Sequence, residues 1–218
     1  MALILDMLEA KKMLADEGFP VVPSRAVKTW EETKGEADRL SYPVVLKLVS
    51  RRYSHKSDIG GVKVGISSEE TLKEAFSELD HLRKHLDPEA QIVIEPMAPK
   101  GVEFFAGFIR DAQFGPVLSF GLGGIFVELF EEVNFLLLPA SERDILSMCR
   151  KMKGWEKLKR GFRHLPPVEE KMVVQFLNRF SKWAYEKPSF KEIDLNPIVA
   201  TQDEVLVVDA RIVILNEI

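Results

Sequence analysis

The sequence predicts an α+β protein of two lobes, because segments with helical spacing and short apolar runs follow one another in mixed order. Its 218 residues suit one domain, or one domain built of two lobes, with a sizeable core. A predicted strand meets two prolines near Glu95–Pro99, which marks the seam between the lobes. We therefore expect a first lobe over residues 1–95, which includes an N-terminal helix, and a second lobe over residues 96–218.

In the first lobe, apolar spacing and capping signals define the expected elements. Met7, Ala10, Met13 and Leu14 recur at helical spacing, and Gly18 marks the end of that helix. The other elements expected here are extended chain from Val21, a helix capped by Thr29 and Glu32 that runs to about Leu40, strands at 44–49 and 62–66, a polar loop at 50–61, and a helix capped by Ser67 and Glu70 that runs to about Leu86.

Around and after the seam, strands dominate. Three glycines fall within Phe120–Gly124, where they allow either the close approach of a ligand or a tight turn without one. The expected strands cover 92–95, 102–110, 116–120, 127–138, 193–200 and 205–214, and the expected helices run from Ser141 through Met152 and from Val168 to Tyr185.

Composition and charge narrow the function classes. The net charge of −4 and the pI near 5.7 disfavour nucleic acid and anionic membranes as partners, since both usually require a basic excess. The single cysteine, Cys149, excludes a disulfide framework and a cysteine zinc site within one chain. No apolar run approaches the ~18 residues that span a bilayer, and the start of the chain lacks the features of a signal peptide. We expect a cytoplasmic protein.

Lys47 lies inside the apolar run 44–49, where a charge needs a partner. Alternation places it on the same face as Val45 and Val49. A lysine within a buried strand rarely lacks an anion, so contact with a ligand phosphate is one interpretation. The alternatives are a lysine whose ammonium group reaches solvent from an edge strand, or one that pairs with a core carboxylate.

The loop between the strands at 44–49 and 62–66 combines His55, lysines, hydroxyl groups and the glycines Gly60 and Gly61. Glycine amides can cradle phosphate oxygens, and lysines add positive charge. The spacing matches neither a Walker A loop nor a dinucleotide fingerprint. A solvated surface loop is the alternative interpretation.

Near the C-terminus, Asp194, Asn196 and Asp209 are candidates for a metal site. Asp194 and Asn196 alternate with apolar residues along one predicted strand, and Asp209 lies in the apolar run that follows a short loop. If the two strands pair antiparallel, the three side chains converge on one face, and such oxygen ligands suit Mg²⁺ together with phosphate and water. Alternatively, Asp194 caps a turn, Asn196 forms a bend, and Asp209 pairs with Arg211.

Taken in order, these segments resemble a known family over almost the whole chain. The chain resembles the ATP-grasp subunit of ADP-forming acetyl-CoA synthetases and, more distantly, the β chain of succinyl-CoA synthetase. The segments that carry the resemblance are EAKK (9–12), GFPV (18–21), YPVVLK (42–47), HKSDIGGV (55–62), DAQFGPV (111–117), FGLGGIFVE (120–128), EIDLNP (192–197) and DAR (209–211).

The resemblance implies an ATP-grasp fold, in which two lobes grip ATP between them. It implies that Lys47 contacts the nucleotide phosphates and that the backbone of the hinge from Glu95 to Met97 meets adenine. It places Glu103 near the ribose. It also implies that Asn196 and Asp209 are Mg²⁺ ligands with Asp194 nearby, in agreement with the alternation described above.

The resemblance further implies a reaction and a partner. In the family, acyl-CoA, phosphate and ADP give free acid, CoA and ATP. CoA binding and a first phosphohistidine belong to a separate α subunit or domain. His55 is similar to a second histidine that passes the phosphoryl group to ADP, a step that suits a neutral imidazole nitrogen.

The sequence departs from the family pattern at two places, and two other functions stay open. Leu136 stands where an arginine is usual, and the basic segment Arg51–Tyr53 replaces a less basic one. The first alternative is a catalytically degenerate ATP-grasp module that binds nucleotide or a partner and regulates. The second is an ATP-grasp carboxylate ligase, which would not need His55.

Overall fold

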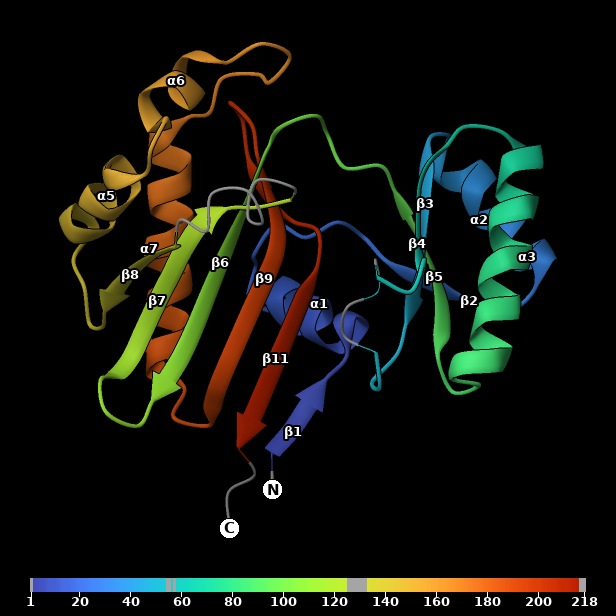
Figure 1. The fold of residues 1–218 in the computed structure, drawn as a ribbon, viewed down its shortest axis with the longest axis horizontal. Coiled ribbons are helices and arrows are strands. Elements are labelled where there is room, and N and C mark those ends of the chain that lie inside the picture. The colour runs from blue at the N-terminus through green and yellow to red at the C-terminus, as the bar shows by residue number, and fades with distance from the viewer. Residues whose placement is uncertain (1, 54–55, 57, 125–132, 216–218) are drawn as a thin grey trace. The chain divides into compact units, whose positions relative to one another are not determined.

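The computed structural model describes residues 2–53, 56, 58–124 and 133–215. It divides the chain into two compact units, one of Val22–Ala98 and one of Met1–Val21 with Pro99–Ile218 (Figure 1). The seam therefore lies at Ala98/Pro99, close to the expected position. Unlike the expected division, however, the N-terminal segment groups with the C-terminal part of the chain, because β1 (Ala2–Leu5) pairs with β11 (Ala210–Leu215).

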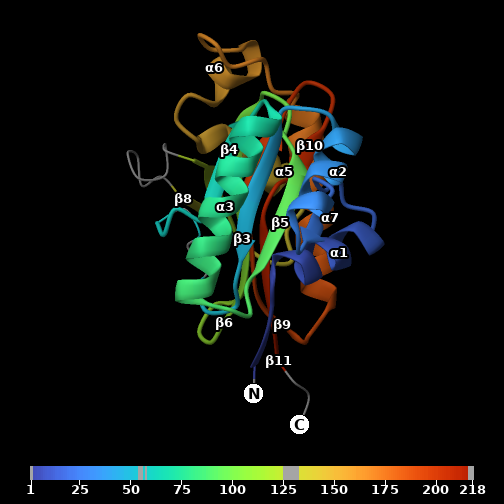
Figure 2. The same ribbon diagram turned by 90° about the vertical axis from the view of Figure 1, so that its right-hand side faces the viewer.

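The unit 22–98 is a four-stranded antiparallel sheet in the order β2-β5-β3-β4, and two helices pack on one face of it (Figure 2). Its apolar core lies between this face and the helices. The elements are β2 (Arg25–Val27), α2 (Trp30–Leu40), β3 (Val44–Val49), β4 (Val62–Ile66), α3 (Glu69–Leu86) and β5 (Gln91–Pro96).

Local signals explain these elements. All six residues of β3 are buried, as expected of its continuous apolar run. The side chain of Thr29 accepts a hydrogen bond from the amide of Glu32 and so caps α2 as predicted. The cap predicted at Ser67 is wrong by one residue. Ser68 is the extended N-cap residue of α3, and its hydroxyl accepts from the amide of Thr71 in a capping box.

The second unit is a seven-stranded sheet with the order β1-β11-β9-β6-β7-β8, in which β10 also pairs with β9. Residues from α1, α5, α6 and α7 form one core with the sheet, centred on large side chains such as Phe104, Phe120 and Trp155. The remaining elements are α1 (Met7–Asp16), β6 (Val102–Asp111), β7 (Gly115–Leu122), β8 (Val133–Leu137), α5 (Glu142–Lys151), α6 (Trp155–Arg160), α7 (Glu170–Glu186), β9 (Phe190–Ala200) and β10 (Val205–Val207).

Several predicted elements of this unit differ from the structure. The single strand expected at 205–214 is two strands, β10 and β11, separated by Val208 and Asp209. The strand expected at 127–138 is observed over β8, and residues 125–132 lie outside the described part of the chain. β1 and α6 were not predicted from the sequence, because a four-residue strand and a six-residue helix carry too short a periodic signal.

No helix in the described part of the chain is both long enough and apolar enough to cross a membrane.

Candidate functional site

Lys47 and Glu95 form a buried ion pair within the unit 22–98. The two residues lie on the paired strands β3 and β5, with Val45 opposite Glu95 and Lys47 opposite Val93, so they are diagonal neighbours on one face. Lys47 Nζ lies 2.7 Å from Glu95 Oε2, and the side chains are only 6% and 1% exposed. The core-carboxylate partner considered from the sequence is therefore present, and a phosphate contact of Lys47 stays a prediction.

Glu95 has a second side-chain partner, which the sequence analysis missed. The hydroxyl of Ser24 donates to Glu95 Oε1 over 2.5 Å, across 71 positions of sequence. One carboxylate oxygen of Glu95 therefore accepts a hydrogen bond from the Ser24 hydroxyl, while the other faces the ammonium group of Lys47. A neutral donor on one oxygen restricts the rotation of the carboxylate. No sequence pattern links Ser24 to Glu95, because the contact depends on the pairing of β2 with β5.

Met97 follows directly after β5, and its side chain is 45% exposed. Its amide donates to the carbonyl of Pro43 over 3.1 Å. That amide is therefore already engaged within the unit, and an adenine contact at the hinge stays a prediction.

The glycines of the loop before β4 shape its backbone. Gly60 has a positive φ of 71°, a conformation that favours glycine. The amide of Gly61 donates to the carbonyl of Lys56 over 2.8 Å, which closes the loop on itself. These contacts support a turn-forming role for Gly61, whereas phosphate binding by Gly60 and Gly61 stays a prediction. His55 lies outside the described residues.

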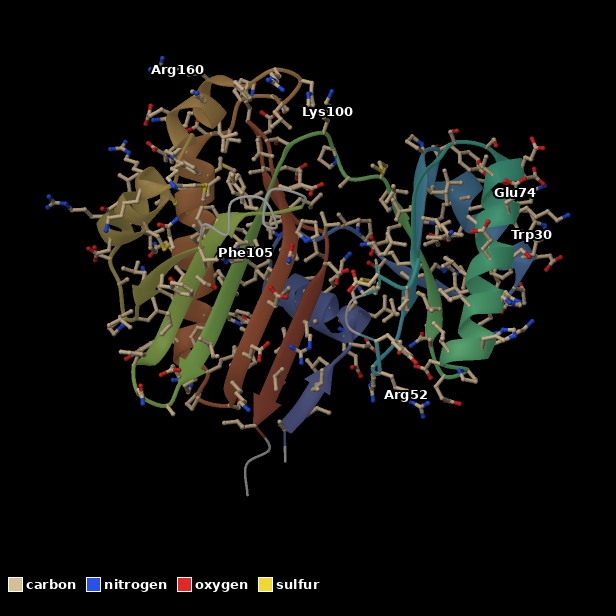
Figure 3. All side chains as sticks on the ribbon, viewed as in Figure 1. Trp30, Arg52, Glu74, Lys100, Phe105 and Arg160 are labelled. Atoms are coloured by element: carbon tan, nitrogen blue, oxygen red, sulfur yellow. The ribbon has the colours of Figure 1, made fainter. Side chains whose placement is uncertain are left out.

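The basic segment of this loop, Arg51–Tyr53, is connected through Ser50 to Asp87, the residue that follows α3. Ser50 Oγ donates to Asp87 Oδ2 over 2.5 Å, and the amides of Arg52 and Tyr53 donate to Ser50 Oγ. The guanidinium of Arg52 lies 4.0 Å from Asp87 but its side chain is 70% exposed (Figure 3). An exposed ion pair of this length contributes little stability.

Glu103 on β6 packs against the glycine-rich segment that follows β7. Its carbonyl accepts a hydrogen bond from the amide of Gly123 over 2.8 Å. Gly124 has a positive φ of 59°, and a Cβ at this position would collide with the carboxylate of Glu103. The glycines therefore permit the close approach of Glu103, and a ribose contact of Glu103 stays a prediction.

Of the candidate metal ligands, Asp209 lies at the break between β10 and β11, and Asp194 and Asn196 lie on β9. The amide of Asn196 donates to the carbonyl of Asp209 over 3.1 Å, so these two residues are brought side by side by their backbones. Asp194 lies two residues earlier on β9, opposite Arg211 and Gly107. Asn196 is exposed, and the two aspartates are half-buried. The expectation that Asp209 lies within a strand is wrong, because the strand is interrupted at Asp209.

The chemistry of this donor set fits Mg²⁺. Within residues 2–215, leaving aside the gaps given above, no three His, Cys, Asp or Glu side chains gather as a metal-binding group. Two carboxylates and one amide oxygen are nevertheless a suitable set for Mg²⁺, which usually takes one or two carboxylates and completes its octahedron with phosphate and water. Asp194, Asn196 and Asp209 as metal ligands stay a prediction.

The departure from the family pattern at Leu136 has a structural context. Leu136 lies opposite the fully buried Leu118 and packs against the core between the sheet and its helices. Its neighbour Phe135 points to the other face and is 68% exposed. In this chain, position 136 therefore contributes to apolar packing.

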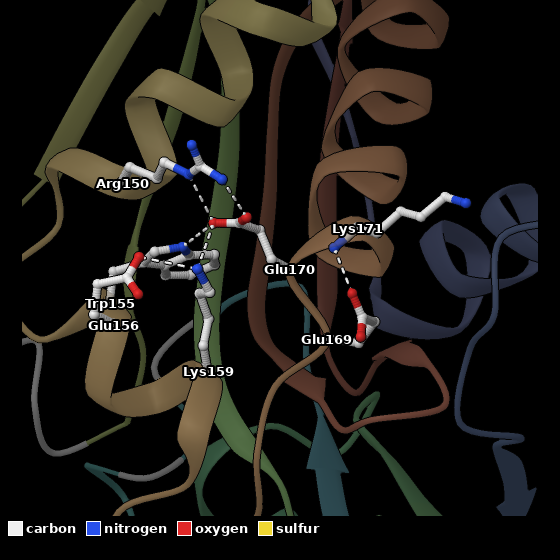
Figure 4. A network of polar contacts seen from close by, with 7 residues as sticks. All are labelled: Arg150, Trp155, Glu156, Lys159, Glu169, Glu170 and Lys171. Carbon is white, nitrogen blue, oxygen red and sulfur yellow. Dashed lines mark hydrogen bonds and ion pairs between the residues drawn. The ribbon is translucent and has the colours of Figure 1, made fainter.

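The carboxylate of Glu170 is surrounded by side-chain donors, an arrangement that was not predicted from the sequence (Figure 4). Arg150 donates to both oxygens of Glu170 over 2.7 and 3.0 Å, Trp155 Nε1 donates over 2.7 Å, and Lys159 lies 3.5 Å away. The hydrogen bond from Arg150, followed by that from Trp155 and the charge of Lys159, lowers the pKa of Glu170 to about 2, although desolvation raises it. The cluster joins α5, α6 and the start of α7, so its role is structural.

Cys149 is fully buried on α5. Burial raises the pKa of its thiol to about 12, so the nucleophilic thiolate is essentially absent near neutral pH.

Comparison with known proteins identifies the family. The model of the ATP-grasp domain matches residues 2–214, and the chain therefore belongs to the ATP-grasp family. It is 39% identical over 209 residues to the β subunit of acetate–CoA ligase [ADP-forming] I of Pyrococcus furiosus, covering 94% of this chain and 90% of that subunit. The resemblance noted in the sequence is thus confirmed.

Solved structures agree with this assignment. Acetyl-coenzyme A synthetase 1 of Ca. Korarchaeum cryptofilum, in complex with coenzyme A and Ca-AMPCP, is 41% identical with a TM-score of 0.88, covering 97% of this chain and 93% of that one. The protein PH1788 of Pyrococcus horikoshii is 34% identical with a TM-score of 0.86, covering 98% of this chain and 92% of that one. The predicted ATP-grasp fold of the α+β class is confirmed.

Proposed function

We propose that this chain is the nucleotide-binding subunit of an ADP-forming acyl-CoA synthetase and that it acts with a CoA-binding partner. The observation that carries this proposal is the match to a β subunit of such an enzyme over nearly the full length of both chains. A second P. furiosus β subunit, of acetate–CoA ligase [ADP-forming] II, is 37% identical and 89% covered. The overall reaction converts acyl-CoA, phosphate and ADP to free acid, CoA and ATP.

Each candidate residue has a separate role in the proposed nucleotide site. The ammonium group of Lys47 binds the nucleotide phosphates, and the hinge from Glu95 to Met97 and Glu103 line the nucleoside. Asp194, Asn196 and Asp209 hold Mg²⁺, which supplies positive charge to the phosphates when it is bound. His55, in the loop with Gly60 and Gly61, accepts the phosphoryl group on a ring nitrogen and gives it to ADP.

The partner is an α subunit that binds CoA and carries the first phosphohistidine. Two observations support a further subunit or domain that acts with this chain. The chain matches only 31% of the length of acetate–CoA ligase [ADP-forming] I of Archaeoglobus fulgidus, at 34% identity. One structure of the Korarchaeum enzyme is described with its phosphohistidine segment pointing towards the nucleotide-binding site. The proposed location is the cytoplasm, where a lone thiol such as that of Cys149 stays reduced.

A regulatory module without catalysis is the second candidate, and the leucine at position 136 is the observation that favours it. Because Leu136 packs against the core in this chain, an arginine there would have to leave that packing to reach a ligand. The retention of Lys47, His55, Asn196 and Asp209 favours the enzyme.

Calorimetric titration of Mg-ADP and Mg-ATP into the purified chain tests the nucleotide site. We expect binding that requires Mg²⁺ and is lost in Asp209→Ala. Asp203→Ala is the matched control, since Asp203 lies exposed in the turn between β9 and β10. Equal binding by Asp209→Ala and the unchanged chain would contradict the metal assignment.

Substitution of His55 tests which class of reaction the protein catalyses. With the CoA-binding partner present, His55→Ala abolishes ATP formation if the phosphoryl group passes through this residue. A carboxylate ligase would keep its activity in His55→Ala, and activity at the level of the unchanged chain would therefore overturn the proposed relay.

A further inference from the structure

Lys11 is a buried lysine on α1 that the proposed function does not use. It is 3% exposed, whereas the side chain of its neighbour Lys12 is 76% exposed and pairs with Asp16 on the same helix. The ammonium group of Lys11 donates to the carbonyl of Val208 over 3.1 Å. This contact joins residues 197 positions apart in the sequence.

Val208 and Asp209 form the break between β10 and β11, and the peptide unit that joins them is held at both ends. Its carbonyl oxygen accepts from Lys11 over 3.1 Å. Its amide, that of Asp209, lies 3.4 Å from the carbonyl of Pro197. The amide of Val208 also donates to Pro197, over 3.1 Å. Rotation of this peptide would redirect the Asp209 side chain, so the contact with Lys11 bears directly on where Asp209 points.

Packing alone does not account for a lysine at position 11. Its neighbours on the buried face of α1 are Met7, Ala10 and Leu14, all apolar. A methionine would fill a similar volume in this setting without an ammonium group to desolvate. Burying an ammonium group costs several kcal/mol unless hydrogen bonds and charges offset the loss of water. The hydrogen bond to the carbonyl of Val208 is one of the interactions that offset this cost, and it places the ammonium group beside a candidate metal ligand.

We propose that Lys11 is a positioning residue for Asp209. By holding the carbonyl of Val208, it keeps the strand break in the conformation that presents the Asp209 carboxylate, and it thereby sets the Mg²⁺ concentration that nucleotide binding requires. This inference rests on the proposed function, because it takes Asp209 as a metal ligand. Residues that orient metal ligands in this way typically change metal affinity by about 10- to 100-fold when replaced.

The test compares Lys11→Met with Lys12→Met in the full chain. Binding of ADP is measured by calorimetry over a series of Mg²⁺ concentrations, and binding of adenosine is measured without metal. We expect Lys11→Met to raise the half-saturating Mg²⁺ concentration by about tenfold and to leave adenosine binding unchanged. Lys12→Met makes the same chemical change one residue away on an exposed side chain, and we expect it to match the unchanged chain.

The controls separate positioning from folding and from the proposed function itself. Lys11→Arg keeps a cation and hydrogen-bond donors, and we expect it to restore most of the Mg²⁺ dependence. If Lys11→Met does not fold, Lys11→Gln, which keeps a neutral donor, takes its place in the same measurement. An unchanged Mg²⁺ requirement in Lys11→Met, or in Lys11→Gln where it takes the place of Lys11→Met, overturns the positioning role alone, and so does an equal loss of adenosine binding. Metal-independent binding of ADP by the unchanged chain overturns the proposed metal site as well, and no binding of ADP overturns the proposed nucleotide site.

Discussion

Each of the two units contains a buried lysine, and the two lysines contact different kinds of acceptor. In the unit 22–98, Lys47 is held by another side chain, the carboxylate of Glu95, which Ser24 fixes in turn. In the other unit, Lys11 is held by a backbone carbonyl, and the segment that carries Asp209 is held by backbone hydrogen bonds to Asn196 and Pro197.

This difference predicts how each unit responds to substitution. A buried pair of opposite charges depends on both side chains, because removing one leaves an uncompensated charge in a medium of low polarity. A backbone hydrogen bond survives a change of side chain at the residue that accepts it. We therefore expect the unit 22–98 to lose stability when one member of its buried pair, Lys47 or Glu95, is replaced. When Asp209 or Asn196 is substituted, the strand break in the other unit should keep its shape and lose only the substituted side chain.

The largest effect is expected for Glu95→Ala, which leaves the ammonium group of Lys47 without this carboxylate. We expect a loss of about 3–5 kcal/mol of unfolding free energy, confined to residues 22–98. Hydrogen exchange of the backbone amides, followed by mass spectrometry in a denaturant series, resolves the two units. The double variant Lys47→Met with Glu95→Leu removes both charges and should be much closer to the unchanged chain. If Glu95→Ala lowers the free energy of unfolding by less than about 1 kcal/mol, the unit does not depend on this buried ion pair.

The second unit also contains a charged residue held by side chains, Glu170, and its contribution to stability can be compared with that of Glu95. Glu170→Gln removes the charge that Arg150 and Lys159 face, and we expect a loss of about 2 kcal/mol near neutral pH, measured by denaturant unfolding. The lowered pKa of Glu170, about 2 against 4.5, means that the folded state favours the ionised carboxylate. Its contribution is complete above pH 4.5 and disappears as the pH falls toward 2.

The pH dependence provides the control for this cluster. The unchanged chain should lose more stability than Glu170→Gln between pH 4.5 and pH 2. Parallel stability curves for the two proteins over this range would show that the cluster contributes nothing through its charge.

A smaller effect is expected for Ser24→Ala, which removes one neutral hydrogen bond from Glu95. We expect a loss of about 1 kcal/mol, together with weaker ATP binding and unchanged adenosine binding, since Lys47 is the group that Glu95 orients. Ser24→Thr keeps the hydroxyl and should restore both properties. Ser68→Ala is the matched control, because it removes the cap of α3 in the same unit without touching Glu95. Equal loss of ATP binding in both variants would argue against a role through Lys47.

The smallest effect is expected at the exposed pair of Lys34 and Glu69, which joins α2 to α3 with side chains 42% and 56% exposed. Lys34→Ala should leave the denaturant midpoint unchanged within error, because solvent and salt screen such pairs. A clear destabilisation would show that exposure is a poor guide to which charges this unit depends on.

Much of the local structure was predictable from the sequence. The continuous apolar run of β3 predicted a strand buried on both faces with Lys47 inside it, and Ser141 with Asp144 predicted the start of α5. These signals lie within a few adjacent residues, and hydrogen-bond geometry or burial acts on them directly. The ordered set of segments that resembles the ATP-grasp subunit also lies in the sequence itself, and the family match over residues 2–214 confirms it.

Tertiary structure alone decided which distant residues meet. Three contacts join segments far apart in the chain: β1 with β11, Lys11 with Val208, and Ser24 with Glu95. The break that carries Asp209 also appeared only in the structure. Helical spacing places Lys11, but not Lys12, on the same face of α1 as Met7 and Leu14, yet it does not show that Lys11 meets the carbonyl of Val208. The physical reason is that spacing assigns a residue to a face, while the partner on that face is set by strand register and packing across the whole sheet.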